Sequence, residues 1–179
     1  PPLAKSGITQ YTAPMPAERT IRSDAFVSTV NNLSFTIEHH GYVVLNDSWH
    51  EENKRTAANV LYLVRAGAGE YDIDGGTIQL RKGHAYLFPV NRIVSFRCND
   101  RLEKFFIHFR LLVGGLFDVF ELFSEARNET PIDTSLFTAI DRFASGDIRD
   151  ILAVHGILIP MITGFIGQAR PGAMAKIAA

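Results

Sequence analysis

The sequence predicts a small antiparallel β-barrel or sandwich followed by two or three helices. Strand-length stretches, alternating or continuously apolar, occupy residues 25–109. Gly and Pro turn signals separate them about every ten residues, and helical periodicity replaces this texture after Arg110. Hydrophobic residues make up 46% of the 179 residues and include thirteen Phe, enough apolar material for a barrel core.

Two segments with different hydrophobic patterns begin the predicted barrel. Ser34–Glu38 alternates between apolar and polar residues, as a half-buried strand does. Ala58–Val64 is a more continuous apolar strand that ends at Gly67 and Gly69.

Turn residues separate the strands that follow. Glu70–Asp74 alternates up to Gly75-Gly76, a pair that suits the positive φ values of a tight hairpin turn. Pro89 ends a strand because it cannot donate to a ladder. The remaining strands are predicted at Thr77–Leu80, at Ala85–Phe88 after a Lys82-Gly83 turn, at Ile93–Arg97 and at Lys104–Leu111.

Helices are predicted over Gly115–Ala126, Ser135–Ala144 and Asp147–Phe165. In the last of them Asp147 is the expected N-cap, and Pro160 is expected to kink the helix or mark a break. Residues 1–24, with little periodicity, are expected to form an arm, and residues 168–179 the start of a linker.

Charge and cysteine content narrow the function classes. The formal net charge is −1, and no basic stripe is present, so this segment is not expected to bind nucleic acid by itself. The alternative is that net charge says little about partners. The single cysteine, Cys98, excludes an internal disulfide framework and fits a reducing, cytoplasmic location.

No membrane span and no signal peptide are expected. The nearest apolar stretch, Ile148–Ile166, is interrupted by polar residues and a proline, namely Arg149, Asp150, His155 and Pro160.

A series of motifs carries a family resemblance. Residues 59–89 contain, in order, an apolar strand, Gly-Ala-Gly, a Gly-Gly turn, a Lys-Gly turn and Phe-Pro, and residues 105–110 read Phe-Phe-Ile-His-Phe-Arg. With Trp49 and Arg55 upstream, this order resembles the ligand-binding cupin domain of AraC-family bacterial transcription regulators. The resemblance covers about residues 45–112 and extends more loosely to about 167.

The resemblance implies a domain layout. Residues 25–112 would form a cupin-like (double-stranded β-helix) effector-binding barrel, and residues 113–167 a helical dimerisation region. Residues 1–24 would be the N-terminal arm, and residues 168–179 would lead to a DNA-binding helix-turn-helix part that this chain does not contain.

The resemblance also implies a ligand-binding site. Phe96, Lys104 and Phe106 match inward positions that contact the effector in sugar-responsive relatives, and Trp49 and Arg55 would lie near the entrance. Strand alternation places His108 on the same face as Lys104 and Phe106, with Phe105, Ile107 and Phe109 on the other. The alternatives are that the two Phe are only barrel core, that Trp49 plugs the barrel end, and that Lys104 lies on the surface.

Metal and nucleophile motifs are missing from the positions where they would be expected. Cupin enzymes hold a metal with a His-x-His cluster, but residues 67–76 contain no histidine, and Val94 occupies the position of a later ligand. His39 and His40 are adjacent and would point to opposite faces of a strand. No Gly-x-Ser-x-Gly motif is present. The sequence therefore predicts no metal site, no cofactor and no catalytic residue.

The last helix carries a broad apolar face with two possible uses. It could pack only on the barrel, or it could pair with the same helix of a second chain in a C2 dimer, which the resemblance favours. The predicted dimerisation residues are Ile151, Val154, Leu158, Met161, Ile162 and Phe165.

Together these points predict the effector-sensing and dimerisation domain of an AraC-type regulator, not an enzyme. Its partners would be a small-molecule effector such as a sugar or small metabolite, a second copy in a homodimer, and DNA only through the absent C-terminal part. The alternatives are a metal-dependent cupin enzyme of dioxygenase or isomerase type and a stand-alone binding cupin.

Overall fold

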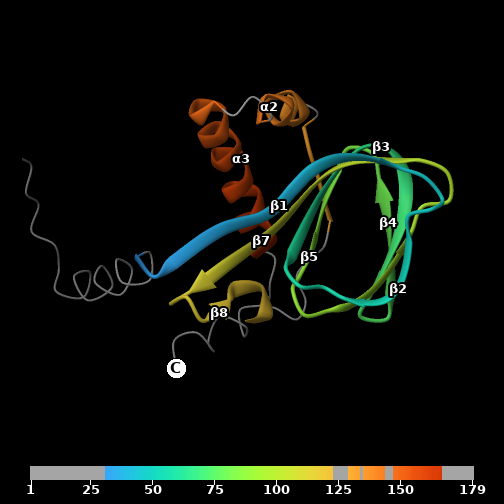
Figure 1. The fold of residues 1–179 in the computed structure, drawn as a ribbon, viewed down its shortest axis with the longest axis horizontal. Coiled ribbons are helices and arrows are strands. Elements are labelled where there is room, and N and C mark those ends of the chain that lie inside the picture. Colours follow the sequence, from blue (N-terminus) through green and yellow to red (C-terminus); the bar gives the residue numbers. More distant parts are fainter. Residues whose placement is uncertain (1–30, 123–128, 134, 144–146, 167–179) are drawn as a thin grey trace, which may run out of the picture.

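The computed structural model describes residues 31–122, 129–133, 135–143 and 147–166. Within them the chain forms a β-barrel with two helices on one side (Figure 1). The arm predicted at 1–24 and the linker predicted at 168–179 lie outside the described residues. The elements in chain order are β1 (Leu33–Leu45), β2 (His50–Arg55), β3 (Asn59–Ile73), β4 (Gly76–Arg81), β5 (His84–Phe88), β6 (Ile93–Arg97), β7 (Leu102–Val113), β8 (Phe117–Asp118), η1 (Val119–Leu122), β9 (Glu129–Pro131), α2 (Ser135–Phe143) and α3 (Ile148–Ile166).

Strand β3 belongs to two antiparallel sheets. Its first half pairs with β5 and β7 in a sheet that also holds β1, β8 and β9. Its second half pairs with β4 and β6, and β2 extends that second sheet. In Figure 1 β1 and β7 run side by side and continue beyond the barrel.

A bend at Gly67 lets one strand serve both sheets. The register between β3 and β7 shifts between Val64 and Ala66, and Gly67 follows with a φ of 76°. The sequence predicted two separate strands around Gly67 and Gly69, but the structure has one. A glycine at positive φ turns the strand sharply without ending its ladder.

The barrel strands bury both of their faces, which accounts for the continuous apolar texture of β3. Leu61 and Leu63 face an outer core between the first sheet and the helices, whereas Val60, Tyr62 and Val64 face an inner core inside the barrel. β7 divides its residues in the same way: Phe105, Ile107, Phe109 and Leu111 enter the outer core.

The hairpin between β3 and β4 turns one residue earlier than predicted. Ile73 pairs with Gly76, and the positive φ values fall on Asp74 (52°) and Gly75 (80°), not on Gly75 and Gly76. Aspartate tolerates this conformation better than most side chains do. The turn at Gly83, the end of β5 before Pro89 and the bounds of β6 agree with the sequence prediction.

The region after β7 differs most from the prediction. In place of a helix over Gly115–Ala126, the described part has the short strand β8 and the 3₁₀ helix η1. β8 pairs with the end of β7 after a turn in which Gly114 and Gly115 both have positive φ, so the chain folds back before any helix starts. Residues 123–126 lie outside the described ranges.

Helix α3 begins as predicted and continues through Pro160. Asp147 caps it, because its Oδ1 accepts a hydrogen bond of 2.8 Å from the Arg149 N–H and its carbonyl accepts from the Ile151 N–H. Since no break occurs at Pro160, α3 presents one long face to the barrel.

The predicted dimerisation face of α3 is turned inward. Val154, Leu158, Ile162 and Phe165 are buried in the outer core, Met161 packs against it, and Ile151 is half-buried. These side chains cover the apolar outer face of the first sheet, which is the first of the two uses that the sequence allowed, and pairing of α3 with a second chain stays a prediction. The exposed apolar side chains of α3 are Ile148, Leu152 and Ile159.

By length and composition, α3 is also the one helix in the described ranges that could cross a membrane. The same apolar character serves its packing on the barrel, because four of its residues are fully buried in the outer core.

We predict that Gly67→Ala destabilises the barrel severely. An added Cβ would lie 1.9 Å from the carbonyl oxygen of Arg101, and the positive φ adds strain. We expect a loss of about 3 kcal/mol or more in the free energy of unfolding, measured by urea denaturation. Gly75→Ala is the matched control, because its φ is similar but nothing lies within 4 Å. It should cost only about 1–2 kcal/mol, and equal losses in the two variants would contradict this account.

Candidate ligand-binding cavity

A cavity of about 350 Å³ lies inside the barrel, between the two sheets. Strands β1, β2, β3, β6 and β7 contribute to its wall, together with the segment between β2 and β3. The lining residues are Val43, Leu45, Trp49, Lys54, Arg55, Thr56, Ala57, Ala58, Val60, Tyr62, Tyr71, Val94, Phe96, Lys104, Phe106 and His108.

All six residues that the sequence predicted for the ligand site line this cavity. They are Trp49, Arg55, Phe96, Lys104, Phe106 and His108. Three of them alternate along β7 with residues of the outer core, as the period of a strand requires. The structure thus brings the six together, and their contact with a ligand stays a prediction.

Stacked aromatic rings form one wall of the cavity. Trp49 stacks on Phe96 with ring centroids 4.5 Å apart, and Phe96 is nearly parallel to Tyr71 at 5.7 Å. Behind them Tyr71 stacks closely on Phe88. Aromatic stacking of this kind holds ring positions firmly, so the wall is flat and largely apolar.

Lys104 is a buried amine within this aromatic wall. It is only 2% exposed, and its Nζ lies 3.3 Å from the ring centroid of Tyr62 and 3.7 Å from that of Trp49. Among the described residues it has neither a hydrogen-bond acceptor nor a carboxylate partner. Burial lowers the pKa of Lys104 well below its usual range, and the nearby Cys98 raises it only partly.

Two phenols share the inner core with this amine. Tyr62 and Tyr71 are buried, and the described part of the chain offers neither hydroxyl a hydrogen-bond partner. Burial raises the pKa of both phenols, so they stay protonated at neutral pH. Neither hydroxyl oxygen is completely sealed from solvent, so water or a ligand in the cavity can be its hydrogen-bond partner.

The polar side chains on the rest of the lining are cationic or neutral. Lys54 and Arg55 are exposed, while His108 is half-buried. Burial lowers the pKa of His108, and His39 and Lys104 lower it further. Within the described ranges, no Asp or Glu lines the cavity, so these residues offer hydrogen-bond donors and positive charge near its surface.

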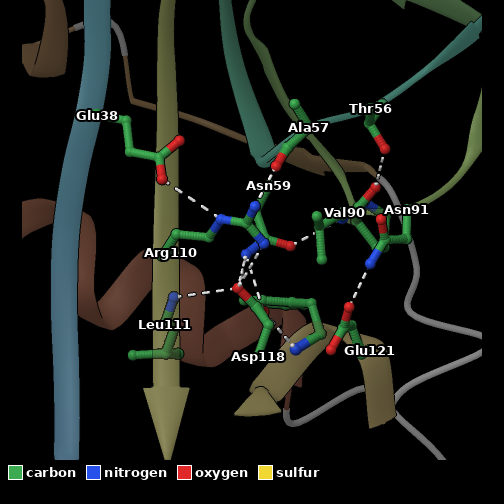
Figure 2. Close-up of polar contacts among 12 residues, drawn as sticks. Glu38, Thr56, Ala57, Asn59, Val90, Asn91, Arg110, Leu111, Asp118 and Glu121 are labelled. Carbon is green, nitrogen blue, oxygen red and sulfur yellow. Dashed lines mark hydrogen bonds and ion pairs between the residues drawn. The ribbon is translucent and has the colours of Figure 1, made fainter. Parts of the chain in front are cut away.

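A buried polar network adjoins the cavity at the start of β3 (Figure 2). The Asn59 Nδ2 donates to both carboxylate oxygens of Asp118, at 2.9 and 2.8 Å. The Val90 N–H donates to the Asn59 Oδ1, and the Phe120 N–H donates to Asp118. Each such group would cost about 1–3 kcal/mol if it were buried without a partner, so the network fixes the β5–β6 turn and η1 against β3.

Arg110 on β7 connects this network to the cavity wall. Its guanidinium donates to the carbonyl oxygen of Ala57, lies 4.0 Å from Asp118 Oδ2 and lies 3.4 Å from Glu38 Oε1 (Figure 2). The Thr56 hydroxyl donates to the carbonyl of Pro89 at 2.9 Å. The cavity-lining segment 56–58 is therefore held from β7 and from the β5–β6 turn.

The positions that metal or nucleophile chemistry would use carry apolar or buried side chains in the described structure. Val94 lines the cavity where the enzyme alternative would need a histidine. Over the described ranges, no three His, Cys, Asp or Glu side chains gather in a way that could hold a metal ion. Cys98 is buried in the inner core, with its Sγ 3.6 Å from the carbonyl oxygen of Ala68.

Sequence reasoning did not identify Tyr62, Tyr71 or the Asn59–Asp118 pair. Tyr62 lies opposite Phe106 in the β3–β7 ladder, and Tyr71 lies opposite Phe96 in the β3–β6 ladder. The register of these ladders would have shown that both phenols face predicted site residues. Without that register, alternation along β3 alone is a weak signal.

Comparison with known proteins gives a likeness of the barrel alone. No family model matches the sequence, and no curated protein matches it. The similar solved structures include a cupin superfamily protein of Desulfitobacterium hafniense, with 15% identity over 44% of this chain and 77% of that one and a TM-score of 0.36. A double-stranded β-helix cupin of Methanocaldococcus jannaschii has 15% identity over 42% and 79%, with a TM-score of 0.35. The Cnp3 cupin domain of Schizosaccharomyces pombe has 15% identity over 43% and 64%, with a TM-score of 0.34.

The fold class stands on the chain's own topology: two antiparallel sheets share β3 and enclose an inner core, and α2 and α3 follow them. The predicted cupin-like barrel followed by helices is confirmed.

We predict that Lys104→Met raises the stability of the protein at pH 7. The folded state must bury an amine without a partner, which costs roughly 1–3 kcal/mol, and Met fills the same space. Lys104 keeps its proton up to about pH 10.4 in the unfolded chain, but burial lowers its pKa in the folded one. The unfolded state therefore binds more protons, so the free energy of unfolding of the wild type should rise from pH 7 toward pH 9.5. Urea denaturation should show a smaller rise in the variant.

The control for this prediction is Lys54→Met. Lys54 lines the same cavity but is exposed, so the variant should keep the pH dependence of the wild type. A Lys104→Met protein that is less stable at pH 7, or that follows the same pH curve as the wild type, would contradict the buried-amine account.

Proposed function

We propose that this chain senses a small molecule that binds in the inner cavity. One observation carries the proposal: the cavity is lined by an ordered aromatic wall, and a buried amine that contacts two of its rings has neither a hydrogen-bond acceptor nor a carboxylate partner in the described part of the chain. The cavity volume of about 350 Å³ is within the range of small-ligand sites, which are mostly apolar with a few placed polar groups.

The lining chemistry defines the kind of ligand. Trp49 and Phe96 offer flat apolar surface, and Lys104 supplies one polar contact at depth. Arg55 adds a donor at an exposed position. A small, largely apolar or ring-shaped molecule with at least one polar oxygen matches this arrangement.

A sensing role needs a route from the cavity to the rest of the molecule, and the polar network supports one. Residues 56–58 line the cavity, and Ala57 accepts a hydrogen bond from Arg110. Arg110 in turn lies beside Asp118, which leads directly into η1. A ligand that favours one arrangement of this segment would shift the population of conformations and so act on neighbouring elements.

The more specific form of the proposal is the effector-sensing domain of an AraC-type transcription regulator. It is supported by the ordered motifs of residues 45–112 and by the helices that follow the barrel. DNA contact would lie in a C-terminal helix-turn-helix part outside this chain. Pairing of two copies would use the exposed apolar side chains Ile148, Leu152 and Ile159, because the opposite face of α3 is already buried.

We expect Val43→Trp to abolish ligand binding by filling the cavity. Val43 lines the cavity from β1, next to Lys104 in the β1–β7 ladder. A panel of benzoate, benzyl alcohol, benzaldehyde and L-arabinose should contain a probe that stabilises the wild type, by about 2.7 kcal/mol when its concentration is 100 times Kd. Thermal shift followed by calorimetric titration would measure this.

Val44→Trp is the matched control for this experiment. Val44 is exposed and points away from the cavity on the neighbouring position of β1, so ligand stabilisation should persist. The proposal fails if no probe stabilises the wild type, or if a probe stabilises Val43→Trp and the wild type equally.

The regulator assignment makes a separate prediction about the gene. The coding sequence beyond Ala179 should encode two turn-linked helices with basic residues, and the longer protein should bind DNA with an affinity that the effector changes. Sequencing the gene and a DNA mobility-shift titration would check this. A stop codon directly after Ala179 would contradict the assignment and leave a stand-alone binding cupin.

A further inference from the structure

The amine of Lys104 has surroundings that are unusual for a lysine. It is buried inside the barrel, where its Nζ lies against the faces of Trp49 and Tyr62. None of the described residues that line the cavity carries a carboxylate. A lysine that binds an anion by charge normally stays solvated or keeps an acid nearby, and neither condition holds here.

Two opposing effects decide the charge of this amine. Contact with two aromatic faces favours the ammonium form, because the ring faces attract a cation. Burial opposes it, because an ion loses its hydration inside the protein. Burial is the larger effect, and it lowers the pKa of Lys104. The uncharged amine has a free electron pair and is a nucleophile.

We propose that Lys104 is a covalent capture site for a small aldehyde or ketone, which it binds as a reversible imine inside the cavity. This inference rests on the proposed function, because it names the ligand class of the same cavity. The chemistry requires a carbonyl carbon within reach of Nζ and a flat group that fits between aromatic walls. Conjugated or aromatic carbonyl compounds meet both needs.

The reaction is balanced without a further reagent. The Nζ electron pair forms a bond to the carbonyl carbon while the carbonyl oxygen takes up a proton, and the nitrogen loses one, which gives a carbinolamine. The carbon–oxygen bond then breaks, and the hydroxyl leaves with a proton from solvent as water. The nitrogen gives up its last proton, so one amine and one carbonyl become one imine and one water, with no change of oxidation state.

The cavity favours this product over free carbonyl. The imine nitrogen carries no obligatory charge, so its formation relieves the burial of a polar amine that has no partner. Trp49 and Tyr62 flank Nζ closely and would lie against a conjugated imine. Lys54 lines the same cavity but is exposed, its Nζ lies 6.0 Å from the ring centroid of Phe96, and Glu51 pairs with it at 3.4 Å.

Benzaldehyde with sodium cyanoborohydride tests the inference, because reduction makes an imine permanent as a benzyl amine. At pH 7 peptide mass spectrometry should place most of the benzyl label on Lys104, at least about tenfold above any other lysine, which corresponds to about 1.4 kcal/mol. Lys104→Met should lose this label, and Lys54→Met should keep it. The preference should fall as the pH approaches 10, where exposed lysines also lose their protons.

Benzyl alcohol separates failure of this inference from failure of the proposed function. It fits the same cavity but cannot form an imine. If benzyl alcohol or benzoate stabilises the wild type, but not Val43→Trp, while benzaldehyde labels all lysines alike, carbonyl capture is overturned and small-molecule sensing stands. If no probe binds and Lys104 is not labelled, both proposals fail.

Discussion

The sharp bend of β3 at Gly67 is the constraint on which the rest of the barrel depends. A single strand must leave the sheet of β5 and β7 and enter the sheet of β4 and β6. Only a residue without Cβ can do this there, because the carbonyl of Arg101 occupies the space of a side chain. The bend also brings Tyr62, before it, and Tyr71, after it, into edge-to-face contact at 5.9 Å. One strand therefore supplies two walls of the cavity.

The buried amine of Lys104 lowers the stability of the barrel. Replacing Lys104 with an apolar residue of similar size would remove a buried amine and leave the inner core otherwise intact. Proteins that keep such a group without an internal partner generally use it in function. The surrounding aromatic stack shows that the amine is held in place by packing, since Trp49 and Tyr62 contact it from two sides.

Local signals in the sequence were sufficient for most of the barrel strands, but not for β2, β8 or β9. Alternation along β7 separated Lys104, Phe106 and His108 from the outer core correctly, because a strand has a fixed period of two. It could not give the ladder register, so Tyr62 and Tyr71 were missed. The buried Asn59–Asp118 pair joins residues 59 positions apart, and no local pattern reports such a contact. The helix predicted at 115–126 does not start where expected, because two glycines after β7 turn the chain back into β8.

Strand β7 separates the cavity from the helices by the thickness of one strand. Its residues alternate between the cavity wall and the outer core, where Phe109 packs on Phe120 and Phe35. A ligand that displaces Lys104 or Phe106 must move the backbone that also carries the outer-core residues on which α3 packs. A closely packed outer core changes between discrete arrangements and does not deform continuously when this backbone moves. Under the proposed function, the inward face of α3 is therefore a receiver of the ligand signal, and its exposed face is the surface that would pass the signal on.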